Sequence, residues 1–356
     1  MPSRGERALR FTEWFVLASG ILLFCVLLAQ LGIGSVLANL RMVGWGIVVI
    51  IAAEIVPVAF NTLGWRAAFS RRSRVPSFWQ LVLARVAGDA ANYLTPTATL
   101  GGEFVRVRIL QGQRTGPSLV ASVMVAKITQ TVGLVVFVAL GLVFVADDTP
   151  LLADARLGIF GGLAAFSVIV AGLLIMQRHG LLAPTLRLVD RWPILRFLAP
   201  LRSSIEQVDA EMTRVHREST GRIVFSSASF ALGYAGGIIE TYLILWFFGA
   251  PTSLELALAI EVLGVALNNL MFFVPLRAGV QEAGKVLVFA MLGLEPAQGL
   301  AAGVIYRMRE LIWAFIGLAI MARSRLSSQS LPPLTRTVPP TSANSHENPC
   351  RDSKSP

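Results

Sequence analysis

The sequence predicts an all-α polytopic membrane protein, and both its composition and its apolar runs indicate this class. Hydrophobic residues make up 54% of the 356 residues, charged residues make up only 15%, and the mean hydropathy is +0.66. These values lie outside the range of ordinary soluble domains. Several apolar runs reach the roughly 20 residues that a helix needs to cross a bilayer. Because a helix pairs its own backbone groups, runs of this length predict spanning helices.

Six uninterrupted apolar runs each predict one spanning helix, and they cover 14–33, 43–64, 118–145, 157–176, 223–248 and 297–322. Two further stretches, 78–110 and 254–294, are apolar but are broken by Pro and Gly. Each broken stretch predicts either two spans or one re-entrant helical hairpin. The membrane domain is therefore expected over residues 1–323.

The distribution of charge indicates which side of the membrane is cytoplasmic. Arg residues follow the second uninterrupted run, a basic stretch follows the fourth, and Asp147 and Asp148 follow the third. The positive-inside rule then places the N-terminus in the cytoplasm, and an even number of crossings returns the C-terminus there. Segment 177–222 is expected to be a cytoplasmic connection with an amphipathic helix. Residues 324–356, rich in Ser, Pro and Thr, predict a disordered tail.

No metal site, cofactor site or soluble-enzyme motif is visible in the sequence. Its two Cys and three His residues do not have metal-ligand spacing. The phosphate-binding loop, the zinc-protease motif and the serine-hydrolase motif are missing. We therefore expect no metal, no cofactor and no catalytic residue. The net charge of +10 is explained by Arg residues that face anionic lipid headgroups, so nucleic acid is not expected as a partner.

The two broken stretches share one pattern of residues. The first reads NYLTPTATLGGEFVRVRIL and the second reads NNLMFFVPLRAGVQEAGKVL. In each, a Pro precedes a Glu by seven positions, with Gly between them, an Asn upstream and a base downstream. Lys127 and Gln130 follow the first Glu by 24 and 27 positions, and Arg307 and Glu310 follow the second by 25 and 28. Each of these later pairs has helical i,i+3 spacing.

This duplication predicts an inverted repeat. Each half contains two spans, one broken hairpin and one further span, and the halves cover about 14–146 and 157–322. A Glu in the span before each hairpin, Glu54 and Glu240, extends the match. An odd number of crossings in each half inserts the second half upside down. Such repeats bring broken helices together near mid-membrane, where free backbone groups and helix ends bind polar parts of a substrate.

The hairpins and the polar residues after them form the candidate site. Pro and Gly can also be simple kinks, and Glu54, Glu240 and Glu261 can be acids that serve packing alone. The duplication favours function, because burying ionisable groups in a membrane is costly. The candidate substrate-binding residues are Asn92, Pro96, Gly101, Gly102, Glu103, Arg106, Arg108, Lys127, Asn269, Pro275, Gly279, Glu282, Lys285, Arg307 and Glu310.

Three segments, NYLTPTATLGGEFVRVRIL, VPLRAGVQEAGKVLVFAMLGL and IYRMRELIWAFIGL, carry a resemblance to a known family. Over about residues 10–325 the chain resembles the transmembrane region of lysylphosphatidylglycerol synthase and its stand-alone, flippase-like relatives, including hopanoid-associated membrane proteins. The resemblance implies an inner-membrane protein of bacteria that moves a phospholipid, an aminoacylated phospholipid or a hopanoid between leaflets or towards the outer membrane. Bifunctional members continue into an aminoacyltransferase domain, whereas only a short tail follows here, so we expect no aminoacyl transfer.

The leading hypothesis is therefore a lipid translocator with a polar headgroup pathway between the hairpins. Five bases are expected to attract a phosphate or another anion: Arg106, Arg108, Lys127, Lys285 and Arg307. Three acids are expected to pair with these bases in the empty state or to bind a cationic headgroup: Glu103, Glu282 and Glu310.

Two alternatives stay open. One is a lipid-headgroup or polyprenyl-phosphate transferase that uses Asp89 and Glu103 as acid and base. The other is a membrane scaffold for a lipid-modifying enzyme. Membrane lipids are the expected partners, proteins of lipid biosynthesis are a further class to test, and the oligomeric state is left open.

Overall fold

The computed structural model describes residues 33–71, 73–94, 100–111, 116–145, 202–218, 220–270 and 279–329, with scattered residues between 161 and 178. Every regular element in these stretches is a helix, which confirms the predicted all-α class. Several predicted features lie outside the described residues: nearly all of the span 14–33, most of the span 157–176, the hairpin tips with Pro96 and Pro275, and the tail beyond 329.

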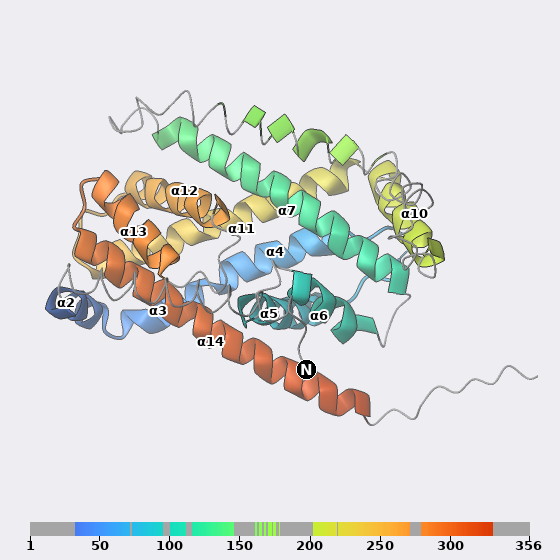
Figure 1. The fold of residues 1–356 in the computed structure, drawn as a ribbon, viewed down its shortest axis with the longest axis horizontal. Coiled ribbons are helices and arrows are strands. Elements are labelled where there is room, and N and C mark those ends of the chain that lie inside the picture. The colour runs from blue at the N-terminus through green and yellow to red at the C-terminus, as the bar shows by residue number, and fades with distance from the viewer. Residues whose placement is uncertain are drawn as a thin grey trace, which may run out of the picture.

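The helices form an elongated bundle (Figure 1). In chain order they are α2 (Ile33–Val43), α3 (Gly46–Ala53), α4 (Ile55–Ala67), α5 (Phe78–Leu94), α6 (Leu100–Leu110), α7 (Gly116–Val145), α10 (Arg202–Glu218), α11 (Thr220–Phe247), α12 (Leu254–Leu270), α13 (Val280–Met291) and α14 (Pro296–Gln329).

Three of the described segments are long and apolar enough to cross a membrane. They are Gly46–Ala67, which joins α3 and α4, Gly116–Phe144 in α7 and Thr220–Phe247 in α11. Large apolar side chains on the outside of the bundle, such as Trp45 and Phe315, are exposed. Lipid contact explains this exposure, which a soluble surface of this extent rarely shows. The chain is a multi-pass membrane protein.

The long helices lie side by side. α4 and α11 pack along each other, α7 packs on α11, and α14 runs along the other side (Figure 1). Where α4, α7 and α11 meet, the Ser226 hydroxyl donates to the Gly64 carbonyl at 2.8 Å and lies 2.8 Å from the Thr129 hydroxyl. Small residues of this kind let membrane helices approach closely and join them by hydrogen bonds.

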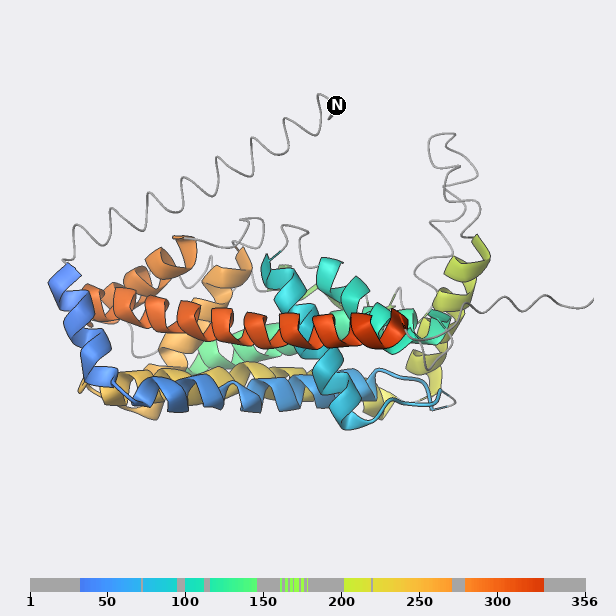
Figure 2. The same ribbon diagram turned by 90° about the horizontal axis from the view of Figure 1, so that it is seen from below.

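Each broken stretch folds as two helices that pack against each other, α5 with α6 and α12 with α13. Both hairpins stand across the long helices, and the C-terminal ends of α5 and α12 and the N-terminal ends of α6 and α13 face the same side of the bundle (Figure 2). α6 has 11 residues and α13 has 12. At 1.5 Å per residue they are about 16 and 18 Å long, well short of the roughly 30 Å hydrocarbon layer. These lengths fit the re-entrant alternative.

The hairpins also connect the two halves of the chain. The last helix of the second half, α14, packs on α5, and the last helix of the first half, α7, packs on α12. Each hairpin is therefore held between helices of both halves. This cross-packing buries Arg85 and Arg106 of the first hairpin and Glu282 and Lys285 of the second.

One predicted span, 43–64, is interrupted in its middle. α3 ends at Ala53, α4 begins at Ile55, and Glu54 lies at the break. The cause is Pro57, which has no N–H to donate to the carbonyl of Ala53 and whose ring crowds that carbonyl.

The amphipathic segment forms α10, which packs on α7 and buries Val208, Met212 and Val215. These are three of the apolar residues that helical spacing places on one face. At the other end of the chain, α14 continues to Gln329. The helix therefore extends six residues beyond the predicted domain boundary at 323, and 324–329 are not part of a disordered tail.

Candidate functional site

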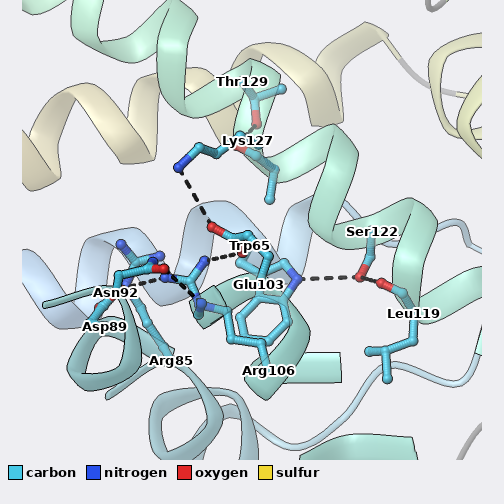
Figure 3. A network of polar contacts seen from close by, with 12 residues as sticks. Trp65, Arg85, Asp89, Asn92, Glu103, Arg106, Leu119, Ser122, Lys127 and Thr129 are labelled. Carbon is cyan, nitrogen blue, oxygen red and sulfur yellow. Dashed lines mark hydrogen bonds and ion pairs between the residues drawn. The ribbon is translucent and has the colours of Figure 1, made fainter. Parts of the chain in front are cut away.

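The first hairpin carries an ion cluster, which we call the first cluster: Arg85, Asp89, Glu103, Arg106 and Lys127. Arg106 of α6 donates to Glu103 at 2.7 Å and to Asp89 of α5 at 2.5 Å. Lys127 of α7 lies 3.6 Å from Glu103, and Arg85 lies 3.5 Å from Asp89. Figure 3 shows these side chains converging from α5, α6 and α7. Three bases and two acids leave one positive charge in excess.

The α5–α6 contact depends on Gly102. A Cβ at this position would collide with the Gly88 carbonyl oxygen and with the side chain of Asn92. The Gly102 N–H donates to the Asn92 side chain at 2.7 Å. Figure 3 shows Asn92 beside Asp89. We expected this glycine to leave backbone groups open for a headgroup. In the structure, Gly102 and Asn92 contact each other across the two helices of the hairpin.

The second hairpin carries a second cluster, formed by Glu282, Arg307 and Glu310. Arg307 of α14 lies 2.9 Å from Glu282 of α13 and 3.7 Å from Glu310. The same guanidinium donates to the Tyr93 hydroxyl of α5 at 2.9 Å, so the cluster bridges both halves of the chain. Two acids and one base leave one negative charge in excess.

Lys285 of α13 pairs with an acid that lies outside its own hairpin motif. It is buried, its ammonium lies 3.9 Å from Glu261 of α12, and it sits 4.1 Å from the ring centre of Tyr306. Glu261 accepts hydrogen bonds from Thr241 at 2.9 Å and from Tyr306 at 3.3 Å. We call these four residues the Glu261 group. It is charge-balanced.

A central cluster lies between α3, α11 and α14. One nitrogen of Arg309, Nη1, contacts Glu54 at 2.9 Å and also donates to Glu240. The guanidinium carbon of Arg309 lies 5.0 Å from the ring centre of Tyr306, so the central cluster adjoins the Glu261 group. The two acids are the pair that the repeat relates, and they share one base.

The three clusters meet at a cavity of about 220 Å³ between α4, α5 and α14. Its charged wall combines one residue or more from each cluster: Glu54, Asp89, Arg309 and Glu310. Its apolar wall is formed by Val58, Val86, Ala90, Trp313 and Ala314, with Tyr93 beside them. The side chain of Asp89 is 46% exposed, so the cavity can be reached from outside the protein. A second cavity, of about 200 Å³, lies between α12 and α13 and is lined by Lys285, Gln281 and Asn268.

Most of the predicted charged residues that the structure describes are brought together, and two predicted residues are not. Arg108 is exposed on α6 and forms no ion pair with any described residue. Asn269 is exposed and donates to the carbonyl of Val265 in its own helix. Gly279, just before α13, has a φ of 75°, a backbone conformation that Gly adopts far more readily than other residues.

Three participants were missed in the sequence. Arg309 lies between Arg307 and Glu310 in RMRE, and the i,i+3 spacing drew attention to its neighbours. Arg309 could have been inferred from Glu54 and Glu240, because two acids within apolar spans require a basic partner. Arg85 precedes Asp89 by four positions, a helical ion-pair spacing that could have been noticed. Tyr93 has no signal of this kind, because its contact with Arg307 depends on how α5 and α14 pack.

Fold and site together define a multi-pass helical membrane protein with a charged interior and two helical hairpins. A family model for the lysylphosphatidylglycerol synthase transmembrane region matches residues 14–317. The chain belongs to this family, which confirms the resemblance and places it among lipid-related membrane proteins. Neither the comparison with curated proteins nor the comparison with solved structures found a match.

Proposed function

We propose that the chain is a lipid translocator of the bacterial inner membrane, which moves a phospholipid, an aminoacylated phospholipid or a hopanoid between leaflets or towards the outer membrane. The observation that carries this proposal is the 220 Å³ cavity at the meeting point of the three clusters. Its wall is charged on one side and apolar on the other. A lipid has the same two parts, so the cavity suits a headgroup with the first atoms of its tail.

The charges in the cavity favour a headgroup that carries a positive group. Three carboxylates, from Glu54, Asp89 and Glu310, face one guanidinium, from Arg309. Arg106 in the first hairpin and Arg307 in α14 are paired with acids in the empty protein. A zwitterionic or aminoacylated headgroup can replace these ion pairs, because its cationic group binds the carboxylates and its phosphate binds a base.

The inverted repeat is part of this proposal, and three features support it. Each hairpin acid pairs with a base from the last helix of its own half, Glu103 with Lys127 and Glu282 with Arg307. The last helix of each half packs on the hairpin of the other half. The described ends of the hairpin helices face one side of the bundle, which a two-fold axis in the membrane plane allows when it runs parallel to the hairpins (Figure 2).

The cytoplasmic location of both termini is likewise proposed. The chain after α4 contacts the end of α10, since Glu218 accepts from the Ser70 hydroxyl at 3.0 Å and from the Arg71 N–H at 2.9 Å. The two basic regions that the positive-inside rule assigns to the cytoplasm therefore meet at one end of the bundle. This arrangement agrees with the expected topology.

We propose that the chain transports lipid without synthesising it. Asp89 and Glu103, the acid and base of the transferase alternative, both pair with Arg106. The first cluster has one positive charge in excess, which favours the ionised form of both acids, so neither is suited to donate a proton to a substrate. Membrane lipids are the proposed partners, and proteins that make the transported lipid are the proposed suppliers.

Comparison of a deletion strain with its parent separates transport from synthesis. Lipids are quantified in each membrane and, with a membrane-impermeant amine reagent, in each leaflet. Translocation predicts a lipid that is still made but is depleted from one leaflet or membrane, and that the wild-type gene restores. A lipid that is missing from the whole cell would instead establish the transferase alternative.

A further inference from the structure

Glu240 is a carboxylate in the interior of the bundle with more negative charge around it than its base can balance. Its side chain is only 2% exposed. One of its oxygens, Oε2, accepts from Arg309, while the other, Oε1, is buried and has no hydrogen-bond partner among the described residues. A buried carboxylate oxygen without a donor is rare. Because Oε1 of Glu240 accepts no hydrogen bond from the described residues, it is the oxygen that can carry a bound proton.

Four charged side chains act on Glu240, and they come from different elements of the bundle. Glu54 comes from the α3–α4 break, Arg309 from α14, and Glu261 and Lys285 from α12 and α13. Lys285 is already matched by Glu261. The central cluster therefore keeps two carboxylates for one guanidinium. Because an uncompensated charge in a membrane interior is costly, one carboxyl group of the cluster is expected to hold a proton.

The cluster is also part of a polar path between the two cavities. Glu54 and Arg309 line the first cavity, and Lys285 lines the second. Between them, Tyr306 lies under both Arg309 and Lys285 and donates to Glu261. Thr241, next to Glu240 in sequence, lies 2.6 Å from the Tyr306 hydroxyl. Protonatable or hydroxyl-bearing side chains thus connect the cavities through the bundle.

We propose that the Glu54–Arg309–Glu240 cluster is a proton-binding site and that proton movement through it drives the transport proposed above. A proton from water in the first cavity binds a carboxylate oxygen of Glu54 or Glu240, and that carboxylate loses its ion pair with Arg309. Release of the same proton towards the opposite side restores the pair. Uptake and release balance, and no other reactant is consumed. The coupling rests on the proposed lipid transport, whereas the proton site does not.

The proton site is tested directly by infrared spectroscopy of the purified full-length protein. A protonated carboxyl group has a carbonyl band that a carboxylate lacks. We expect this band at neutral pH in the wild type, a downshift in heavy water, and its loss in Glu240→Gln or Glu54→Gln. Glu255→Gln, at the exposed start of α12, is the matched control and should keep the band. Two variants are used so that a folding failure of one still leaves a test.

Coupling is tested in vesicles of phosphatidylglycerol and phosphatidylethanolamine that contain the purified protein, a fluorescent phosphatidylethanolamine and an internal pH dye. A pH gradient should speed wild-type lipid movement several-fold and should produce lipid-dependent proton flux. In Glu240→Gln the ratio of rates with and without the gradient should fall to one, while Glu255→Gln should behave as the wild type.

The outcomes separate the two proposals. A wild type without the carboxyl band overturns the proton site. A band with lipid movement that ignores the gradient overturns the coupling. A band without any lipid movement, with or without a gradient, supports the site but overturns the proposed function.

Discussion

Each hairpin acid is held by an arginine in the interior of the bundle, and these contacts decide what a single substitution does. Glu103 contacts Arg106 at 2.7 Å, and Glu282 contacts Arg307 at 2.9 Å. Arg106 is buried and lies 5.8 Å from the ring of Trp65. An arginine in such a place cannot return to water when its acid is removed. Loss of Glu103 therefore raises the excess positive charge of the first cluster, whereas loss of Glu282 leaves Arg307 with Glu310 at 3.7 Å.

Glu103→Gln and Glu282→Gln should both impair lipid movement. Glu103→Gln should be the more severe, because its cluster then has two positive charges in excess, whereas Arg307 keeps Glu310. Removing one member of a buried pair costs on the order of 3–5 kcal/mol. Melting temperature and translocation rate of the purified variants measure the effect. Glu206→Gln is the control, because its pair with Arg202 is half exposed and is worth less than about 1 kcal/mol. Two hairpin variants with wild-type rate and stability would reduce both acids to packing residues.

Gly102 is the second residue whose substitution has a defined result. Gly102→Ala introduces a Cβ that collides with the Gly88 carbonyl and Asn92, so overpacking should destabilise the hairpin by about 1–3 kcal/mol. Gly284→Ala, in the other hairpin, meets nothing within 4 Å and should be neutral or stabilising by up to about 1 kcal/mol. Thermal unfolding of both variants is the measurement. Equal melting temperatures would contradict the close contact at Gly102.

The sequence predicted that the hairpin acids pair with the nearby bases, but it did not predict which base meets which acid. Glu103 contacts Lys127, and Glu282 contacts Arg307. Lys285 instead pairs with Glu261. Helical spacing fixes which residues share a face of one helix, but the opposing helix is set by tertiary packing. Arg309 shows this, because it points to α3 and α11 while Arg307 points to α13.

Among the elements, the long apolar helices and the broken stretches were predictable, because run length and Pro/Gly interruptions determine both. The break at Glu54 was not predicted, although Pro57 marked it, because the surrounding run is apolar and a proline in a membrane helix often causes only a bend. The roles of Asn92 and Gly102 in packing were also not predicted. Close approach of two helices depends on atoms that are distant in sequence.

The stability of α10 is expected to depend on pH. Burial lowers the pKa of His216 below its ordinary value of 6.5, because the neutral ring is favoured inside the protein. Its Nδ1 lies 3.1 Å from the Met212 carbonyl, and its Nε2 is buried without a partner among the described residues. The folded state therefore resists protonation. The stability that the neutral ring contributes is complete above about pH 6.5 and declines as the pH falls below it.

Hydrogen–deuterium exchange of residues 202–218 tests this dependence. After correction for intrinsic exchange, protection should be lower at about pH 5.5 than at about pH 7.5. His216→Gln keeps a polar group but cannot gain the proton, so its protection should change much less. The same loss of protection in His216→Gln would show that another group is responsible.

For the whole molecule, the family and the multi-pass class followed from sequence, while the inverted repeat stays a proposal that topology can test.

In a background without Cys25 and Cys350, we expect Ser73→Cys and Ser203→Cys to react with an impermeant thiol reagent from the cytoplasmic side. Thr252→Cys, after α11, should react from the opposite side. If positions 203 and 252 reacted from one side, α11 would not be a span and the inverted order of the halves would be lost.

Lipid movement by the purified protein is the most direct test of the translocator. Vesicles that contain fluorescent phosphatidylglycerol or phosphatidylethanolamine are treated with an impermeant reductant, which reaches only outer-leaflet label unless lipids cross. Ala314→Leu fills the wall of the 220 Å³ cavity, and Ala319→Leu adds the same atoms on the exposed face of the same helix. We expect label in both leaflets to be lost with wild type and Ala319→Leu, and inner-leaflet label to be retained with Ala314→Leu. Two results would contradict lipid transport through this cavity. In one, the wild type retains inner-leaflet label, as protein-free vesicles do; in the other, Ala314→Leu loses this label as the wild type does.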